Sequence, residues 1–209
     1  LPKDARVGTS SPRRAAWVRR AVPTADVTPL RGNVGTRLAR LAATDAMDAA
    51  VLALAGLQRL GLFVGPGGHV ARDPRRPTAA GTPPTTVPDG LMGTVLEPES
   101  MLPAPGQGAL GIEVASGNAD AAAVAARLNH RNTWVAVQAE REFLRGLGGG
   151  CAAPVSALGR VLGHQLELRV AVERHGRWWT ATGRRVASEG TLLGAELAAE
   201  ARRESGGWA

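Results

Sequence analysis

The residues best suited to chemistry are one cysteine and a set of arginines. Cys151 is the only cysteine in 209 residues, and three glycines at 148–150 precede it. One thiol can form no internal disulfide and cannot by itself build a thiolate metal site. The residues leave two interpretations open: a small buried apolar side chain, or a thiolate that carries a covalent group. The glycines favour the second interpretation only in that they leave space beside the sulfur.

Arginine supplies nearly all of the positive charge. The formal net charge is +7 at pH 7, and Lys3 is the only lysine. A guanidinium group binds carboxylates and phosphates through two parallel hydrogen bonds, so the excess suits a small polyanion or nucleic acid. A GC-rich genome would produce the same arginine bias. The chain has no tyrosine and two phenylalanines, so a base-stacking surface is poorly supplied and nucleic acid is the weaker alternative.

The first sixty residues alternate between expected strands and expected helices. Strands are predicted at 6–10, 26–30 and 48–53, and helices at 12–21, 35–43 and 56–61. Ser11 is typical of a helix N-cap, and Pro12 of the first helical position. This alternation predicts an α/β domain with an open parallel sheet.

Four arginines follow the ends of the expected strands: Arg13, Arg14, Arg31 and Arg59. Ligands of open parallel sheets bind at the edge where the strands end. Arg37 lies farther along the second helix and is expected to reach the same cleft. The pattern therefore predicts an anion site, although a well-capped surface helix with solvated arginines would show the same residues.

The rest of the chain is expected to form a second unit that presents Cys151. Residues 63–95 are rich in glycine and proline and predict a long irregular loop. A Pro/Gly hinge within 101–114 is expected to lead into a strand, followed by helices at 118–128 and 132–147. From Ala157 onward, alternating apolar residues predict three antiparallel strands covered by one helix. The four histidines are scattered, so no metal site is predicted.

Six sequence segments occur in an order that resembles one enzyme family, hydroxymethylbilane synthase, also called porphobilinogen deaminase. The segments are Val7-Gly-Thr-Ser-Ser-Pro-Arg-Arg14, Leu30-Arg-Gly-Asn-Val-Gly-Thr-Arg37, Ala55-Gly-Leu-Gln-Arg-Leu-Gly61, Leu102-Pro-Ala-Pro-Gly-Gln-Gly-Ala109, Glu140-Arg-Glu-Phe-Leu144 and Gly149-Gly-Cys-Ala-Ala-Pro154. Each segment alone is a modest signal, but all six in order are specific.

The resemblance implies an activity and a cofactor. The family joins four porphobilinogen molecules head to tail with loss of ammonia to give hydroxymethylbilane, in tetrapyrrole (porphyrin and heme) biosynthesis. A dipyrromethane cofactor on a thioether to Cys151 would prime the growing oligopyrrole. By position, the cofactor-binding residues would be Cys151, Arg13, Arg14, Arg31 and Arg37. The substrate-binding residues would be Thr9, Ser11, Arg31, Arg37, Arg59 and Gln107.

The resemblance also implies a domain organisation. Residues 1–102 would be domain 2, a periplasmic-binding-protein-like α/β domain, with an insertion at 63–95. Residues 103–128 would be a hinge and a remnant of domain 1, and residues 129–209 would be domain 3, a small α+β unit that carries the cofactor. The chain begins at Leu1, which we interpret as the start of a processed chain or a fragment.

One departure from the family concerns catalysis. The aspartate that serves the family as acid and base belongs to the front of domain 1, and neither Asp45 nor Asp48 matches its position. We therefore expect no catalytic residue, a chain that is inactive or nearly so by itself, and exposed apolar side chains in the domain 1 remnant.

The expected protein is a cytoplasmic monomer that binds neither nucleic acid nor membranes. The alternative function is a non-catalytic anion-binding module of periplasmic-binding-protein type, which would not need Cys151.

Overall fold

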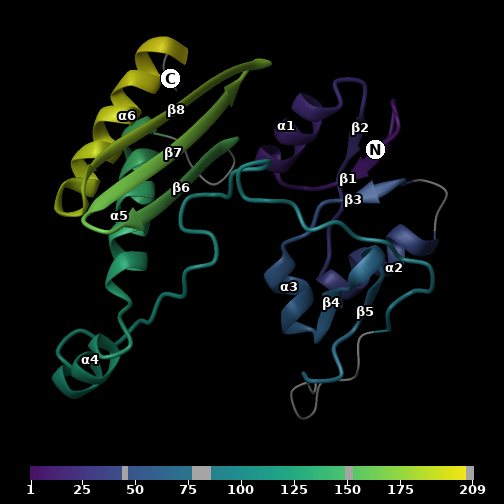
Figure 1. Ribbon diagram of the computed structural model, residues 1–209, viewed down its shortest axis with the longest axis horizontal. Coiled ribbons are helices and arrows are strands. Elements are labelled where there is room, and N and C mark those ends of the chain that lie inside the picture. The colour runs from purple at the N-terminus through teal and green to yellow at the C-terminus, as the bar shows by residue number, and fades with distance from the viewer. Residues whose placement is uncertain (44–46, 77–85, 149–152, 206–209) are drawn as a thin grey trace. The chain divides into compact units, whose positions relative to one another are not determined.

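The computed structural model describes residues 1–43, 47–76, 86–148 and 153–205. The chain divides into two compact units, Leu1–Met101 and Leu102–Ala209 (Figure 1). Within the described residues, no helix combines the length and the apolarity needed to cross a bilayer.

Unit 1 is built on a three-stranded parallel sheet. Its strands are β1 (Arg6–Gly8), β2 (Asp26–Thr28) and β3 (Ala49–Ala50), in the order β2-β1-β3. Each strand is followed by a helix: α1 (Pro12–Ala21), α2 (Val34–Ala43) and α3 (Leu54–Arg59). Val7 of the central strand is fully buried and belongs to the same apolar cluster as Val18 of α1. The predicted α/β class is therefore confirmed, although the third strand is shorter than expected.

The N-terminus of α1 depends on a single serine. The Ser11 hydroxyl accepts a hydrogen bond from the backbone N–H of Arg14 at 3.4 Å, and Pro12 occupies the first turn. We expect Ser11→Ala to lower the free energy of unfolding of unit 1 by about 1 kcal/mol, because that N–H loses its partner. Hydrogen exchange of the β1 amides measures this value. Ser10→Ala, at the exposed neighbouring residue, is the control, and an equal loss in both variants would contradict the capping role.

The prediction of an irregular loop at 63–95 is wrong for its first part, up to residue 72. The strands β4 (Leu62–Val64) and β5 (Val70–Arg72) form an antiparallel hairpin around a 3₁₀ turn, η1 (Pro66–Gly68). The glycines that suggested a loop make the reversal instead, since Gly67 and Gly68 both have positive φ. Leu62 is buried in a cluster with Leu38 and Leu57, so the hairpin belongs to the core of unit 1. Residues 77–85 lie outside the described part.

The strand expected after the hinge is also absent. Residues 101–118 form turns and extended chain without a strand, and 90% of Leu110 and 55% of Ile112 is exposed. Helix α4 (Ala119–Ala126) follows, and the Asn118 side chain caps it by accepting from the N–H of Ala121 at 2.9 Å. Val124 and Leu128 are exposed as well. The predicted exposure of this apolar segment is thus confirmed, and a strand without partners in the described chain does not form.

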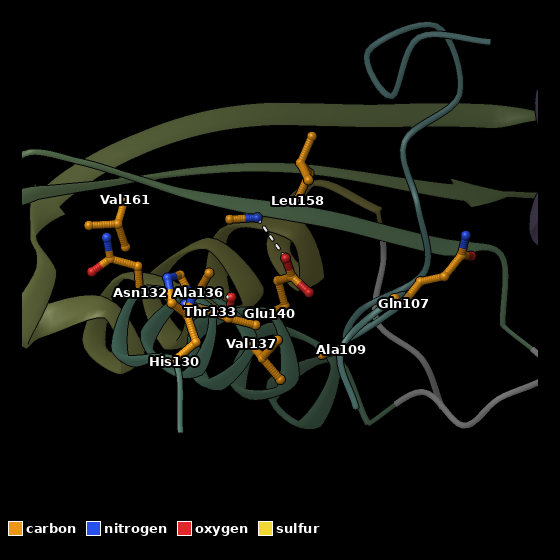
Figure 2. Close-up of a pocket in the computed structure, with 12 residues that line it drawn as sticks. Gln107, Ala109, His130, Asn132, Thr133, Ala136, Val137, Glu140, Leu158 and Val161 are labelled. Carbon is orange, nitrogen blue, oxygen red and sulfur yellow. Dashed lines mark hydrogen bonds between the residues drawn. The ribbon is translucent and has the colours of Figure 1, made fainter. Parts of the chain in front are cut away.

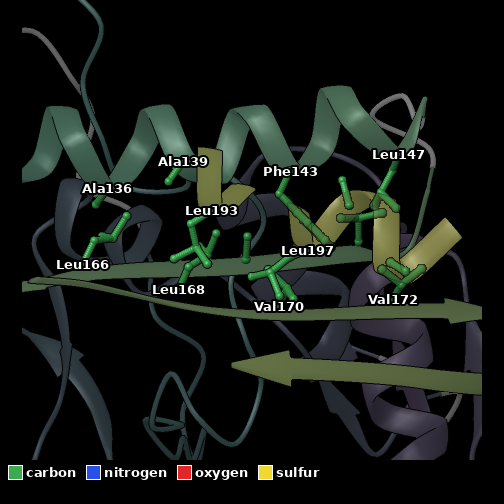
Figure 3. Close-up of a cluster of buried hydrophobic side chains, with 14 residues drawn as sticks. Ala136, Ala139, Phe143, Leu147, Leu166, Leu168, Val170, Val172, Leu193 and Leu197 are labelled. Carbon is green, nitrogen blue, oxygen red and sulfur yellow. The ribbon is translucent and has the colours of Figure 1, made fainter. Parts of the chain in front are cut away.

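Unit 2 contains a three-stranded antiparallel sheet, β6 (Val155–Leu162), β7 (Gln165–Arg174) and β8 (Arg177–Val186), in that order. The helices α5 (Arg131–Leu147) and α6 (Gly190–Ser205) pack on one face of this sheet (Figure 3). The short turn η2 (Ala187–Glu189) precedes α6. Alternate residues of β7 point into this core: Leu166, Leu168, Val170 and Val172. Two helices therefore cover the sheet instead of the one expected, because α5 contributes Phe143 and Leu147 to the same cluster.

Candidate functional site

The turn after β1 is held by the two hydroxyl residues that the motif singled out. The N–H of Thr9 donates to the carbonyl of Thr28 at 2.9 Å, which ties this turn to the end of β2. The Thr9 hydroxyl accepts from the N–H of Ser11 at 3.2 Å, and Ser11 caps α1. Each hydroxyl accepts through its oxygen and keeps its own O–H as a possible donor. Thr9 is nevertheless buried, so its first role is to shape the turn.

Helix α1 places two arginines at this edge of the sheet. Arg14 reaches across to the segment after β3, where its Nη1 donates to the carbonyl of Val51 at 3.2 Å. Arg13 is buried, with only 6% of its surface exposed. Burial, and then the charge of Arg14, lowers the pKa of Arg13 to about 10. Arg13 therefore still carries its charge at neutral pH, at a cost in desolvation.

Helix α2 adds a third cation to the same place. Asn33 caps this helix by accepting from the N–H of Thr36 at 2.8 Å, and the Arg37 Nε donates to the carbonyl of Gly32 at 2.8 Å. Burial, and then the charge of Arg37, lowers the pKa of Arg14. A neighbouring cation lowers the pKa of an arginine only at close range, so the sheet edge holds a cluster of three cations. We call Arg13, Arg14 and Arg37 the arginine cluster.

The arginine cluster has the electrostatics of an anion site. Among the described residues, neither Arg14 nor Arg37 makes an ion pair with a carboxylate. Mutually repelling, partly desolvated cations are stabilised when an anion binds between them, and guanidinium groups fit carboxylates best. The order β2-β1-β3 also puts the cluster at the switch point of an open parallel sheet, where ligands of such folds bind.

Four predicted site residues are not brought to the cluster by any described contact. Arg31 is exposed after β2, and its carbonyl accepts from the Arg40 Nη1 at 3.2 Å. Arg59 is exposed at the end of α3. Gln107 lies in unit 2, exposed, with its Oε1 accepting from the N–H of Ala104 at 3.4 Å. Cys151 lies outside the described residues. The functional roles of these four stay predictions.

Unit 2 contains a buried carboxylate that the sequence reasoning missed. Glu140 of α5 is 6% exposed, and its two oxygens accept from the N–H groups of Gly106 at 2.6 Å and Gly159 at 2.7 Å. Burial raises the pKa of Glu140, and the two hydrogen bonds oppose that change. A signal did exist, because Glu140 follows Ala136 by four residues and so shares the apolar face of the helix.

A cavity of about 370 Å³ lies beside this carboxylate. Figure 2 shows the side chains that line it, from α5, β6 and the chain around Gln107, with Glu140 pointing toward β6. Its other polar lining includes His130 and Asn132. Across the described ranges, no three His, Cys, Asp or Glu side chains gather as metal ligands would.

Comparison with known proteins gives two family matches. Residues 1–123 match the model described as "Porphobilinogen deaminase, dipyromethane cofactor binding domain". Residues 134–202 match the model described as "Porphobilinogen deaminase, C-terminal domain". The chain belongs to the porphobilinogen deaminase family. The first match contains the arginine cluster, whereas Cys151 falls within the second.

Individual porphobilinogen deaminases resemble this chain over most of its length. The protein of Roseiflexus sp. (strain RS-1) is 38% identical over 207 residues, which are 99% of this chain and 59% of the relative. That of Burkholderia thailandensis is 42% identical over 201 residues, 96% of this chain and 51% of the relative. That of Mycobacterium avium is 41% identical over 162 residues, which are 78% of this chain and 43% of the relative. The chain thus spans about half the length of the curated relatives it matches.

Proposed function

We propose that this chain provides the cofactor-carrying and carboxylate-binding part of a porphobilinogen deaminase, the transferase of tetrapyrrole biosynthesis that joins four porphobilinogen units into hydroxymethylbilane. The observation that supports this best is the arginine cluster at the switch point of the sheet, where Arg14 and Arg37 repel each other and neither pairs with a described carboxylate. Porphobilinogen and its oligomers carry an acetate and a propionate on every pyrrole ring, so their binding needs several fixed cations.

The residues present fit a dipyrromethane. Its side chains are carboxylates, and within the described residues no acid pairs with the guanidinium groups of Arg14 and Arg37. Arg13, Arg14, Arg31 and Arg37 would hold these carboxylates, and Cys151 would hold the cofactor through a thioether. When bound, the cofactor supplies the primer onto which pyrrole units are added.

The remaining site residues would bind the substrate and the growing oligopyrrole. The capped N-terminus of α1 presents backbone N–H groups at the edge where the carboxylates would bind, which favours negative charge. Thr9 and Ser11 fix that turn, and Arg31, Arg37, Arg59 and Gln107 would contact substrate carboxylates. In this proposal the protein's own contribution is to orient anionic rings and to keep them fixed.

Turnover requires an acid and base that we assign to no residue of this sequence. The Asp48 carboxylate accepts three hydrogen bonds from Arg6, which fits a structural role, and Asp45 lies outside the described residues. We therefore propose that the 209-residue chain binds but does not turn over substrate by itself.

In the same proposal, 1–102 is domain 2, 103–128 is the hinge with the domain 1 remnant, and 129–209 is domain 3. The exposed apolar side chains of 110–128 would pack against the part of the family's sequence that this chain does not span. A monomeric state and a cytoplasmic location stay predictions.

The arginine cluster provides the test of this proposal. We expect the double substitution Arg14→Gln and Arg37→Gln to weaken binding of a free dipyrromethane bearing acetate and propionate groups by at least about 100-fold. Each lost charge-assisted contact costs about 1.5–3 kcal/mol. The free energy of unfolding should change little, because the relief of repulsion between the two side chains offsets the loss of their hydrogen bonds to the carbonyls of Val51 and Gly32. Isothermal titration calorimetry at low salt measures the dissociation constants.

The control is Arg20→Gln, at an arginine that lies over the Trp17 ring at 5.2 Å, near the other end of α1. Its affinity should match that of the unaltered chain. Equal affinities in all three proteins would contradict the proposed site. Tight binding of single-stranded nucleic acid, lost with rising salt and without any preference for the dipyrromethane, would favour the nucleic-acid alternative.

A further inference from the structure

The segment 102–109, which we call the hinge segment, begins unit 2, and two described hydrogen bonds join it to the rest of that unit. The carbonyl of Pro103 accepts from the N–H of Ala157 on β6 at 3.0 Å. The N–H of Gly106 donates to the Glu140 carboxylate at 2.6 Å. The first contact joins two backbones and needs no particular side chain. The second depends entirely on Glu140.

Glu140 also joins α5 to β6. Its other oxygen accepts from the N–H of Gly159 at 2.7 Å (Figure 2). This approach is possible because Gly159 has no side chain: a Cβ atom there would lie 3.0 Å from the Cα and Cβ of Ala136. The carboxylate thus connects three segments that are distant in sequence, namely the hinge segment, α5 and β6.

Two of these segments, α5 and β6, flank in the sequence the part of the chain that contains Cys151. Helix α5 ends at Leu147, Gly148 takes a left-handed conformation with φ of 73°, and β6 begins at Val155. Any movement of α5 against β6 therefore shifts Gly148 relative to Val155, and these two residues lie on either side of Cys151 in the sequence. Burying a carboxylate in an apolar helix face is costly, and here the hydrogen bonds from two backbone N–H groups offset that cost.

We infer that Glu140 is a positioning residue that locks the hinge segment onto the α5–β6 scaffold carrying Cys151. This inference rests on the proposed function, in which Cys151 holds the cofactor and Gln107 of the hinge segment contacts substrate. In this inference Glu140 contacts neither the cofactor nor the substrate. It acts by holding the Gly106 backbone, and with it the adjacent Gln107, at a fixed place relative to both ends of the cofactor loop.

Residue-resolved hydrogen exchange of the full chain tests this inference. In Glu140→Leu both acceptors are lost, and we expect the amides of Gly106 and Gly159 to exchange about tenfold faster or more. Glu140→Gln keeps the shape of the side chain and one acceptor oxygen, so one of the two amides should stay protected. The Ala157 amide, which donates to Pro103, reports whether the hinge segment remains attached at its first point.

Two controls separate positioning from general destabilisation. Glu142→Gln alters a carboxylate of the same helix that pairs with Arg145, and it should leave both glycine amides unchanged. Leu197→Ala opens the core of unit 2 and should raise exchange throughout α5 and β7 without singling out Gly106. Unchanged exchange at Gly106 in Glu140→Leu, or a rise no larger than that of the α5 amides, overturns the inference. Exchange does not depend on dipyrromethane, so a chain that never acquires the cofactor would defeat the proposed function without affecting this result.

Discussion

The Cys151→Ser chain, produced in cells that make porphobilinogen, is expected to have the mass of the bare polypeptide. The unaltered chain is expected to carry one additional dipyrromethane. Only a thiolate is a competent nucleophile and covalent carrier at neutral pH, because a serine hydroxyl without an activating base stays protonated. Since Cys151 is the only cysteine, the expected effect is complete loss of the adduct. Intact-mass spectrometry of the two purified chains measures it.

The control for this substitution is the non-covalent affinity of the arginine cluster. Free dipyrromethane should bind the cofactor-free Cys151→Ser chain through Arg13, Arg14 and Arg37, because serine removes only the attachment point. An adduct that persists in Cys151→Ser would show attachment elsewhere and would contradict the assignment. The bare mass in both proteins would mean that the arginines and the cysteine of this chain are not sufficient for loading.

Gly194→Ala is expected to destabilise unit 2 by roughly 1–3 kcal/mol, although alanine is the better helix former. A Cβ atom at Gly194 of α6 would collide with the backbone carbonyl oxygen of Ala139 on α5 and lie 3.1 Å from the Glu142 Cβ. A backbone atom cannot swing aside as a side chain can, so the two helices would have to separate. Native-state hydrogen exchange of the α5 and β7 amides measures the free energy of unfolding of this unit.

Gly111→Ala provides the matched control for that prediction. Gly111 has open space around its Cα and no positive φ, so the same substitution should change stability by less than about 0.5 kcal/mol. A Gly194→Ala chain as stable as the unaltered one would show that α5 and α6 can move apart without loss.

Local sequence signals predicted most of the regular elements. Ser11 with Pro12 marked the start of α1, Asn118 marked the start of α4, and Gly148 marked the end of α5, and each lies where the structure has it. These signals succeed because a cap or a left-handed glycine acts within a few residues of chain. The alternation of apolar residues in β7 also predicted the strand, since Leu166, Leu168, Val170 and Val172 share the face that packs into the core of unit 2.

Sequence reasoning failed where pairing partners decide the structure. The apolar residues around Leu110 and Ile112 suit a strand, yet no described strand lies beside them, and a lone strand leaves its N–H and C=O groups unpaired. The glycines of 63–72 suggested a loop, yet the hairpin forms because Leu62 finds a place in the cluster with Leu38 and Leu57. In both cases burial and pairing outweighed the local composition.

By itself, the sequence determined the family, the α/β and α+β classes of the two units, and the residue types of an anion site, because motifs and periodicity act over short stretches of chain. Only the tertiary structure showed that Arg13, Arg14 and Arg37 gather at one sheet edge with lowered pKa at Arg13 and Arg14, because that proximity arises from parallel pairing of strands distant in sequence. It also decided the role of Glu140, whose partners lie 34 residues before it and 19 residues after it. No local pattern specifies such contacts, since packing brings them together only when the whole unit has formed.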